Sequence, residues 1–187
     1  EERKFRILTL VVARLMAFAA VALATQENTY TVEGKVTPTK VGTKKKPTPV
    51  QLDFGYTVSE KDGDRPGLIN QYDIFFENSQ VNTSVAPVCT AEQIDRDQSD
   101  VNCPKGSLVG TGNVENKAGA SADETADTIA CHLELKVYNA GKNKAALFLS
   151  GGPSPNGPSD PENCPLNIAK AIDANFVRDA KGTALQF

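Results

Sequence analysis

The chain has 187 residues, 40% of them hydrophobic, and a formal net charge of −3. This length can bury one sizeable core, so we expect a single domain with, at most, a leader segment. A mildly acidic chain lacks the clustered Lys and Arg of general nucleic-acid binders, so nucleic acid is not an expected partner. Frequent Val, Thr, Gly and Pro favour a mainly β fold.

The N-terminal segment has the layout of a secretory signal. A basic stretch, residues 3–6, precedes an apolar run, residues 7–23, and Ala22-Leu23-Ala24 has the form of a cleavage site. We therefore expect residues 1–24 to be a signal peptide and residues 25–187 to form one β-sandwich domain, secreted or held at the cell surface.

Two alternatives remain for residues 1–24. The first is a retained membrane anchor, although the apolar run is near the minimum span and Arg14 lies inside it. The second is a packing helix like that of type IV pilins, which resemble this segment in placing Phe at the start of an apolar helix. Pilins carry Glu four residues further on, whereas here Phe5 is followed at that distance by Thr9. The pilin-like filament subunit is therefore disfavoured.

Alternating apolar and polar residues predict strands in the first half of the chain, at residues 30–36, 51–58 and 72–76. Turn-forming residues between the last two strands predict that they form an antiparallel hairpin. The basic, Pro-containing segment 37–48 is expected to be a solvated loop. Its lysines could bind an anionic polymer, but no aromatic residues are interleaved with them.

A capping box, Thr90-Ala91-Glu92-Gln93, predicts a short helix from about Ala91 to Gln98. The following Asp95-Arg96-Asp97 resembles the start of an EF-hand loop. However, Asp100 stands where such a loop needs Gly, and Gly106 stands where it needs Glu. We therefore expect a solvated helix face, with no metal and no cofactor.

The second half is predicted to contain a strand at residues 107–114 and a long strand at residues 129–137 that forms a hairpin with residues 145–149. The alternation puts Cys131 on the core side and His132 on the polar side. Residues 168–176 fit a helix or a strand. The chain stops in a strand-like pattern at Phe187, and we expect the natural protein to continue beyond it.

Four cysteines in an exported chain are most simply used as two disulfides. Three pairings are possible, and Cys89–Cys103 with Cys131–Cys164 is favoured because it closes the shorter loops in sequence order. A zinc site is disfavoured because the chain has no C-x-x-C motif and its single His, His132, adjoins Cys131.

Two segments carry a resemblance to a known group. The first runs from Pro87-Val88-Cys89-Thr90 to Ile94, and the second is Cys103-Pro104-Lys105-Gly106-Ser107-Leu108-Val109-Gly110-Thr111-Gly112. They resemble a shared pattern of uncharacterised secreted proteins of actinobacteria. The resemblance implies an exported, disulfide-stapled β-domain and implies no activity.

The sequence favours a non-catalytic domain with a structural or adhesive role, whose partners are cell-envelope or extracellular components. A catalytic triad or dyad would have to use His132, which lies mid-strand. A carboxylate pair acting on a glycan remains an alternative. A polysaccharide- or ion-binding module is the other alternative, and Tyr56 and Tyr138 are its candidate aromatic contacts. A membrane contact is expected only if residues 1–24 are retained.

Overall fold

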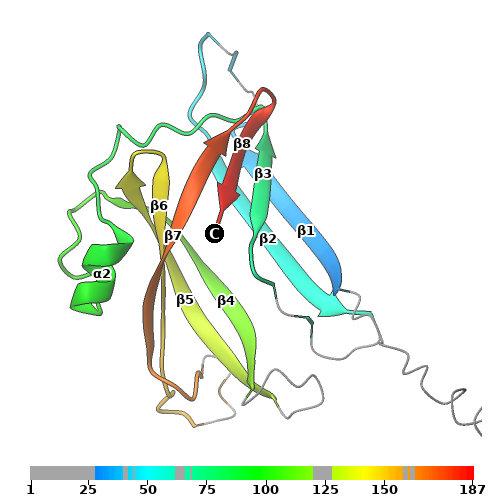
Figure 1. The fold of residues 1–187 in the computed structure, drawn as a ribbon, viewed down its shortest axis with the longest axis vertical. Helices are drawn as coiled ribbons and strands as arrows, with labels where there is room; N and C mark the ends of the chain where they lie inside the picture. The colour runs from blue at the N-terminus through cyan, green and yellow to red at the C-terminus, as the bar shows by residue number, and fades with distance from the viewer. Residues whose placement is uncertain are drawn as a thin grey trace, which may run out of the picture.

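The computed structural model describes residues 28–39, 42–43, 45–61, 66–67, 69–119, 128–157, 160 and 163–187. The expected signal peptide or hydrophobic helix, residues 1–24, lies outside them. Within the described residues, eight strands and one short helix form two antiparallel sheets in a curled, sandwich-like arrangement (Figure 1). The predicted mainly β class, with one short helix between two disulfide-bonded cysteines, is confirmed.

The smaller sheet has two strands, β1 (Asn28–Thr37) and β2 (Gln51–Glu60), which pair antiparallel and are called the β1–β2 ribbon. Their register sets Val32 opposite Tyr56 and Val36 opposite Leu52. Because side chains alternate between the two faces of a strand, one face of the ribbon is apolar and the other is polar.

The larger sheet has six strands in the order β3-β8-β7-β6-β5-β4, all neighbours being antiparallel. Its strands are β3 (Asp73–Glu77), β4 (Leu108–Gly119), β5 (Thr128–Gly141), β6 (Lys144–Gly151), β7 (Ile168–Arg178) and β8 (Gly182–Gln186). The expected second hairpin is present as β5–β6. The ambiguous segment 168–176 is a strand because it lies between β6 and β8 and pairs with both.

The hairpin predicted between residues 51–58 and 72–76 is wrong. β2 pairs with β1, whereas β3 pairs with β8, which is more than a hundred residues further along the chain. In this register Ile74 lies opposite Leu185, next to the apolar side chains of the larger sheet. Burial of these side chains against β8 decides the pairing of β3, and turn chemistry between β2 and β3 could not reveal it.

The two faces of the larger sheet carry different layers. Helix α2 (Ala91–Asp97) contacts β6 and β7 on one face. The β1–β2 ribbon lies on the other side of the sheet, beside β3 (Figure 1). The core is therefore divided into one cluster beneath α2 and further apolar clusters on the side of the ribbon.

Candidate functional site

The segment around α2 is fixed by local capping and by a disulfide. The Thr90 hydroxyl accepts a hydrogen bond from the Gln93 N–H at 3.2 Å, and the Gln93 side chain accepts one from the Thr90 N–H at 2.9 Å. Cys89, directly before this cap, is bonded to Cys103 beyond the helix. A helix of 7 residues is too short to persist alone in water, so its attachment at both ends and its packing stabilise it.

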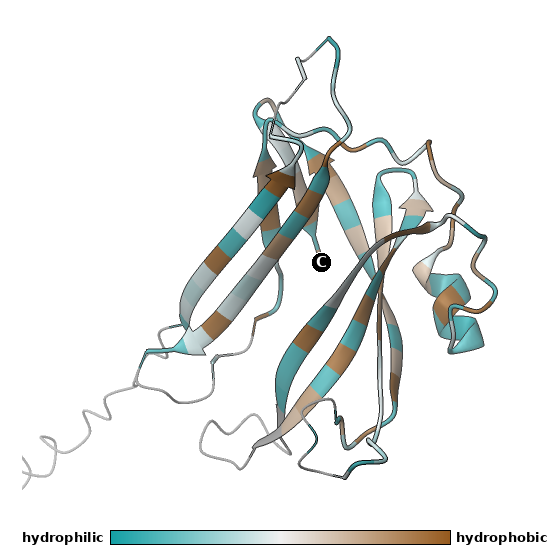
Figure 2. Ribbon diagram, turned by 180° about the vertical axis from the view of Figure 1, so that it is seen from behind, coloured by the Kyte–Doolittle hydropathy of each residue, from teal (hydrophilic) through white to brown (hydrophobic). Residues whose placement is uncertain are grey.

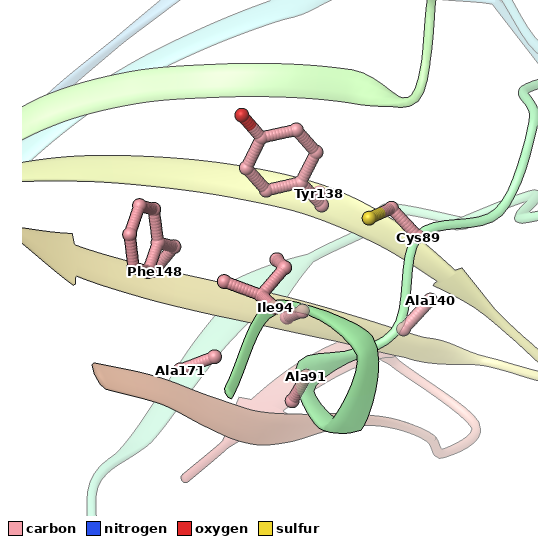
Figure 3. Packing of buried hydrophobic residues seen from close by; sticks show 8 residues of the cluster. Cys89, Ala91, Ile94, Tyr138, Ala140, Phe148 and Ala171 are labelled. Atoms are coloured by element: carbon pink, nitrogen blue, oxygen red, sulfur yellow. The ribbon is translucent and has the colours of Figure 1, made fainter. Parts of the chain in front are cut away.

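Ile94 is the apolar anchor of α2. Its side chain is 1% exposed and points from the helix toward the sheet, where it lies among Tyr138, Phe148 and Ala171 (Figure 3). Ala91 lies on the same side of the helix, one turn earlier. Through this cluster, α2 covers the part of the larger sheet beneath it.

Two aspartates tie the same segment to the sheet by charge. Asp95 accepts hydrogen bonds from the Lys170 side chain and, at 2.7 Å, from the Ala171 N–H of β7. The hydrogen bond from Lys170, followed by that from the backbone, lowers the pKa of Asp95 below its ordinary value. The charged carboxylate is thus the form that holds α2 against β7.

Asp100 makes the second tie, to β5. Its carboxylate accepts hydrogen bonds from the Tyr138 hydroxyl at 2.5 Å and from Lys136 Nζ at 2.9 Å. Burial alone would raise the pKa of Asp100, but the hydrogen bonds from Tyr138 and Lys136 outweigh it, so the pKa is lowered. Burial, and then the hydrogen bond to Asp100, raise the pKa of the Tyr138 phenol.

Tyr138 is not the exposed aromatic contact that the sequence suggested. It is 5% exposed and belongs to the cluster beneath α2. Alternation along β5 does place Tyr138 on the same side as His132 and Lys136, but α2 and its flanking segment cover that side at the Tyr138 end of the strand. A pattern within one strand cannot show which other element packs over it.

The second disulfide joins Cys131 of β5 to Cys164, and both cysteines are buried. The two disulfides are the pairs favoured from the sequence. Beside Cys131, His132 lies with Nδ1 3.8 Å from a carboxylate oxygen of Glu115 on β4. With Cys131 in a disulfide, His132 and Cys131 do not form a nucleophile–base pair.

The carboxylates of the segment that resembles the start of an EF-hand loop do not converge on one point. Asp95 is directed to Lys170, whereas Asp97 binds Arg96 and Asn102. Among the described residues, no group of three or more His, Cys, Asp or Glu side chains is arranged to hold a metal ion. A hollow of about 20 Å³ beside α2 has room for about one water molecule.

The apolar face of the β1–β2 ribbon is exposed along its length. Tyr30 is 60% exposed and Val32 is 70% exposed, although both alternate as core residues would. The other exposed apolar residues of this face are Val36, Leu52, Phe54 and Tyr56. Figure 2 shows brown bands alternating with pale and teal ones along the ribbon. We call these six side chains the ribbon surface.

Aromatic contacts attach one end of the ribbon surface to the larger sheet. Phe54 meets Phe76 edge to face at 5.5 Å between ring centroids, and Tyr56 lies 5.2 Å from Tyr72. Tyr72 in turn stacks on Phe187 at 5.2 Å. Burial, and then the neighbouring Tyr72, raise the pKa of Tyr56 to about 12. These rings hold β2 beside β3 and leave the side chains of β1 uncovered.

Comparison with known proteins finds no family model that matches the chain, and no curated protein or solved structure that matches it. None of the helices in the described part of the chain is long and apolar enough to cross a membrane.

Proposed function

We propose that this chain is a secreted or cell-surface β-domain with a non-catalytic, structural or adhesive role, which acts through the ribbon surface. One observation carries the proposal: six apolar side chains of one ribbon face remain exposed in a chain that buries apolar residues on both faces of its larger sheet. Contiguous apolar patches of this kind on soluble proteins commonly mark interaction sites.

The disulfides support the compartment. Cys89–Cys103 and Cys131–Cys164 pair all four cysteines, and such bonds persist in oxidising, exported environments. Both bonds belong to the larger sheet and its covering segments, so they stabilise the body of the domain and leave the ribbon without a covalent tie. A rigid body that presents an apolar surface suits a structural or adhesive module.

A polysaccharide-binding role is the second candidate, favoured by the placement of two tyrosines. Tyr30 lies opposite Val58 and Tyr56 lies opposite Val32, so Tyr30 and Tyr56 are diagonal neighbours on one ribbon face. Exposed aromatic rings side by side can stack on sugar rings.

The test measures retention of the exported protein on cell-envelope fractions of the cells that produce it. We expect Val32→Asp to release the protein, because it places a charge in the ribbon surface. Thr31→Asp is the matched control, because it adds the same charge on the polar face of the same strand. Equal retention of the two variants contradicts the proposal. Release by Tyr30→Ala together with competition by a soluble glycan supports the polysaccharide role instead.

A further inference from the structure

Free strand edges give the ribbon a second way to make contacts. In the described part of the chain, the edge strands of the two sheets are β1 and β2 in one sheet and β3 and β4 in the other. A free edge presents unpaired backbone N–H and C=O groups, onto which a further strand can pair. Which edge is used depends on the side chains that would lie opposite one another.

Two of the four edges oppose self-pairing by charge. The charged residues of β2 are Asp53 and Glu60, and those of β3 are Asp73 and Glu77. An antiparallel pair of two β2 or two β3 strands gains no opposite-charge pair in any register, and registers that set two acidic side chains opposite one another are destabilised. Of the free edges, only β1 and β4 carry both signs of charge.

β1 is self-complementary about its glycine. Glu33 and Lys35 flank Gly34 and lie on the polar face of the ribbon. When two copies of β1 run antiparallel with Gly34 opposite Gly34, each Glu33 meets the Lys35 of the other copy. The same register sets Val32 opposite Val36. In this register the apolar faces of the two copies lie on the same side of the new sheet, and apolar residues pair with apolar residues. On the other side, two pairs of opposite charges form.

We propose that two copies of this chain associate through the outer edges of β1, antiparallel about a two-fold axis at Gly34, as a four-stranded sheet of order β2-β1-β1-β2. The inference rests on the proposed function, since it names a second copy as the first partner of the same ribbon. A two-stranded sheet is only marginally stable alone, and four strands stabilise it further. Closed two-fold pairing uses one patch on both copies and stops at the dimer.

β4 is the competing edge, because Glu115 and Lys117 also stand two residues apart. Glu115, however, lies beside His132 of the neighbouring strand, and β4 already belongs to a sheet of six strands. Glu33, by contrast, lies opposite Gly55, and the structure shows no ion pair for Glu33 within the ribbon. The β4 edge therefore supplies a matched control for charge reversal.

The test measures the oligomeric state of the exported, disulfide-bonded protein by analytical ultracentrifugation over a range of concentrations. Glu33→Lys places lysine opposite lysine twice in the pair, and Lys35→Glu places glutamate opposite glutamate twice. Each variant should weaken dimerisation by on the order of tenfold to a hundredfold. Mixing the two variants pairs opposite charges again, so the mixture should form a heterodimer. Glu115→Lys should leave the dimer unchanged.

If the single variants were monomeric because they were misfolded, mixing them would not restore association. Association in the mixture therefore shows that the charges, and not misfolding, weaken the dimer of each variant alone. A monomeric wild-type protein at high micromolar concentration overturns the proposal, as does a mixture that stays monomeric. Loss of the dimer in Glu115→Lys, with no effect of Glu33→Lys, also overturns it by assigning the interface to β4. If dimerisation fails while Val32→Asp still releases the protein from the envelope, the proposed function survives and only the self-pairing is rejected.

Discussion

Replacing Asp100 by Ala should destabilise the domain by removing a carboxylate that binds both Tyr138 and Lys136. Tyr138 is 5% exposed, so its hydroxyl would lose its hydrogen bond to Asp100 in a place with little access to water. A hydrogen bond to a charged group contributes about 1.5–3 kcal/mol. The ion pair with Lys136 is about a quarter exposed and adds at most about 1 kcal/mol. We expect a loss of about 2–4 kcal/mol in the free energy of unfolding.

A double-mutant cycle at neutral pH isolates this contact. Unfolding by urea, with both disulfides intact, is measured for the wild type, for Asp100→Ala, for Tyr138→Phe and for the double variant. Tyr138→Phe removes the hydroxyl and keeps the ring beneath α2. Each single variant removes the same hydrogen bond between Tyr138 and Asp100. The stability lost by the double variant should therefore be about 1–2 kcal/mol smaller than the sum of the two single losses.

Two results would contradict the stabilising role of Asp100. Strict additivity of the two substitutions would mean that the hydroxyl and the carboxylate do not stabilise one another. A loss below about 0.5 kcal/mol for Asp100→Ala would place Asp100 with ordinary surface residues. In that case Cys89–Cys103 and Ile94 would hold the segment around α2 without help from its charges.

Three further predictions concern the same region. Replacing Cys89 and Cys103 together by Ser should lower the free energy of unfolding by about 3 kcal/mol and should increase hydrogen exchange first in α2. Non-reducing peptide mapping of the unsubstituted protein checks that Cys89 is joined to Cys103. Ile94→Ala should cost about 2–4 kcal/mol in urea unfolding, while Val101→Ala, at a site 79% exposed, should cost under about 0.5 kcal/mol. The folded pKa of Asp95 is lowered, so its stabilising effect is present above the unfolded value of about 3.9 and is lost as the pH falls through the folded value. Thermal melts below pH 4 should therefore fall less steeply for Asp95→Asn than for the wild type, and an unchanged slope would contradict this.

Local patterns in the sequence predict most of the elements. Alternation locates β1, β2 and β5, and Thr90 with Gln93 locates the start of α2, because these signals lie within a few neighbouring residues. The cysteine pairing also follows from short-loop closure. The leader predicted at residues 1–24 stays a prediction, since it lies outside the described residues.

The errors concern contacts between distant segments. β3 and β8 pair although more than a hundred residues separate them in the chain, and turn chemistry near β3 favoured the wrong partner. Tyr138 was assigned to the solvated side because its strand alternates cleanly, but α2 covers it. Alternation predicts that β1 and β2 are strands, and nothing within β1 indicates that Val32 faces no covering layer. Alternation fixes the side of a residue and leaves open what lies on that side.

Stabilising contacts are concentrated in the larger sheet and the segments that cover it, and fewer of them involve the ribbon. Both disulfides, the buried cluster around Ile94 and the ties from Asp95 and Asp100 act on the larger sheet and its cover. The ribbon depends on its own strand pairing, on aromatic contacts at the β2 end and on the hydrogen bonds between Asn28 and Gly67. A two-stranded sheet with an uncovered apolar face is the least self-sufficient part of such a fold. Pairing at the β1 edge would give the ribbon a neighbouring strand that the described part of its own chain does not supply. We therefore expect association through β1 also to stabilise the ribbon.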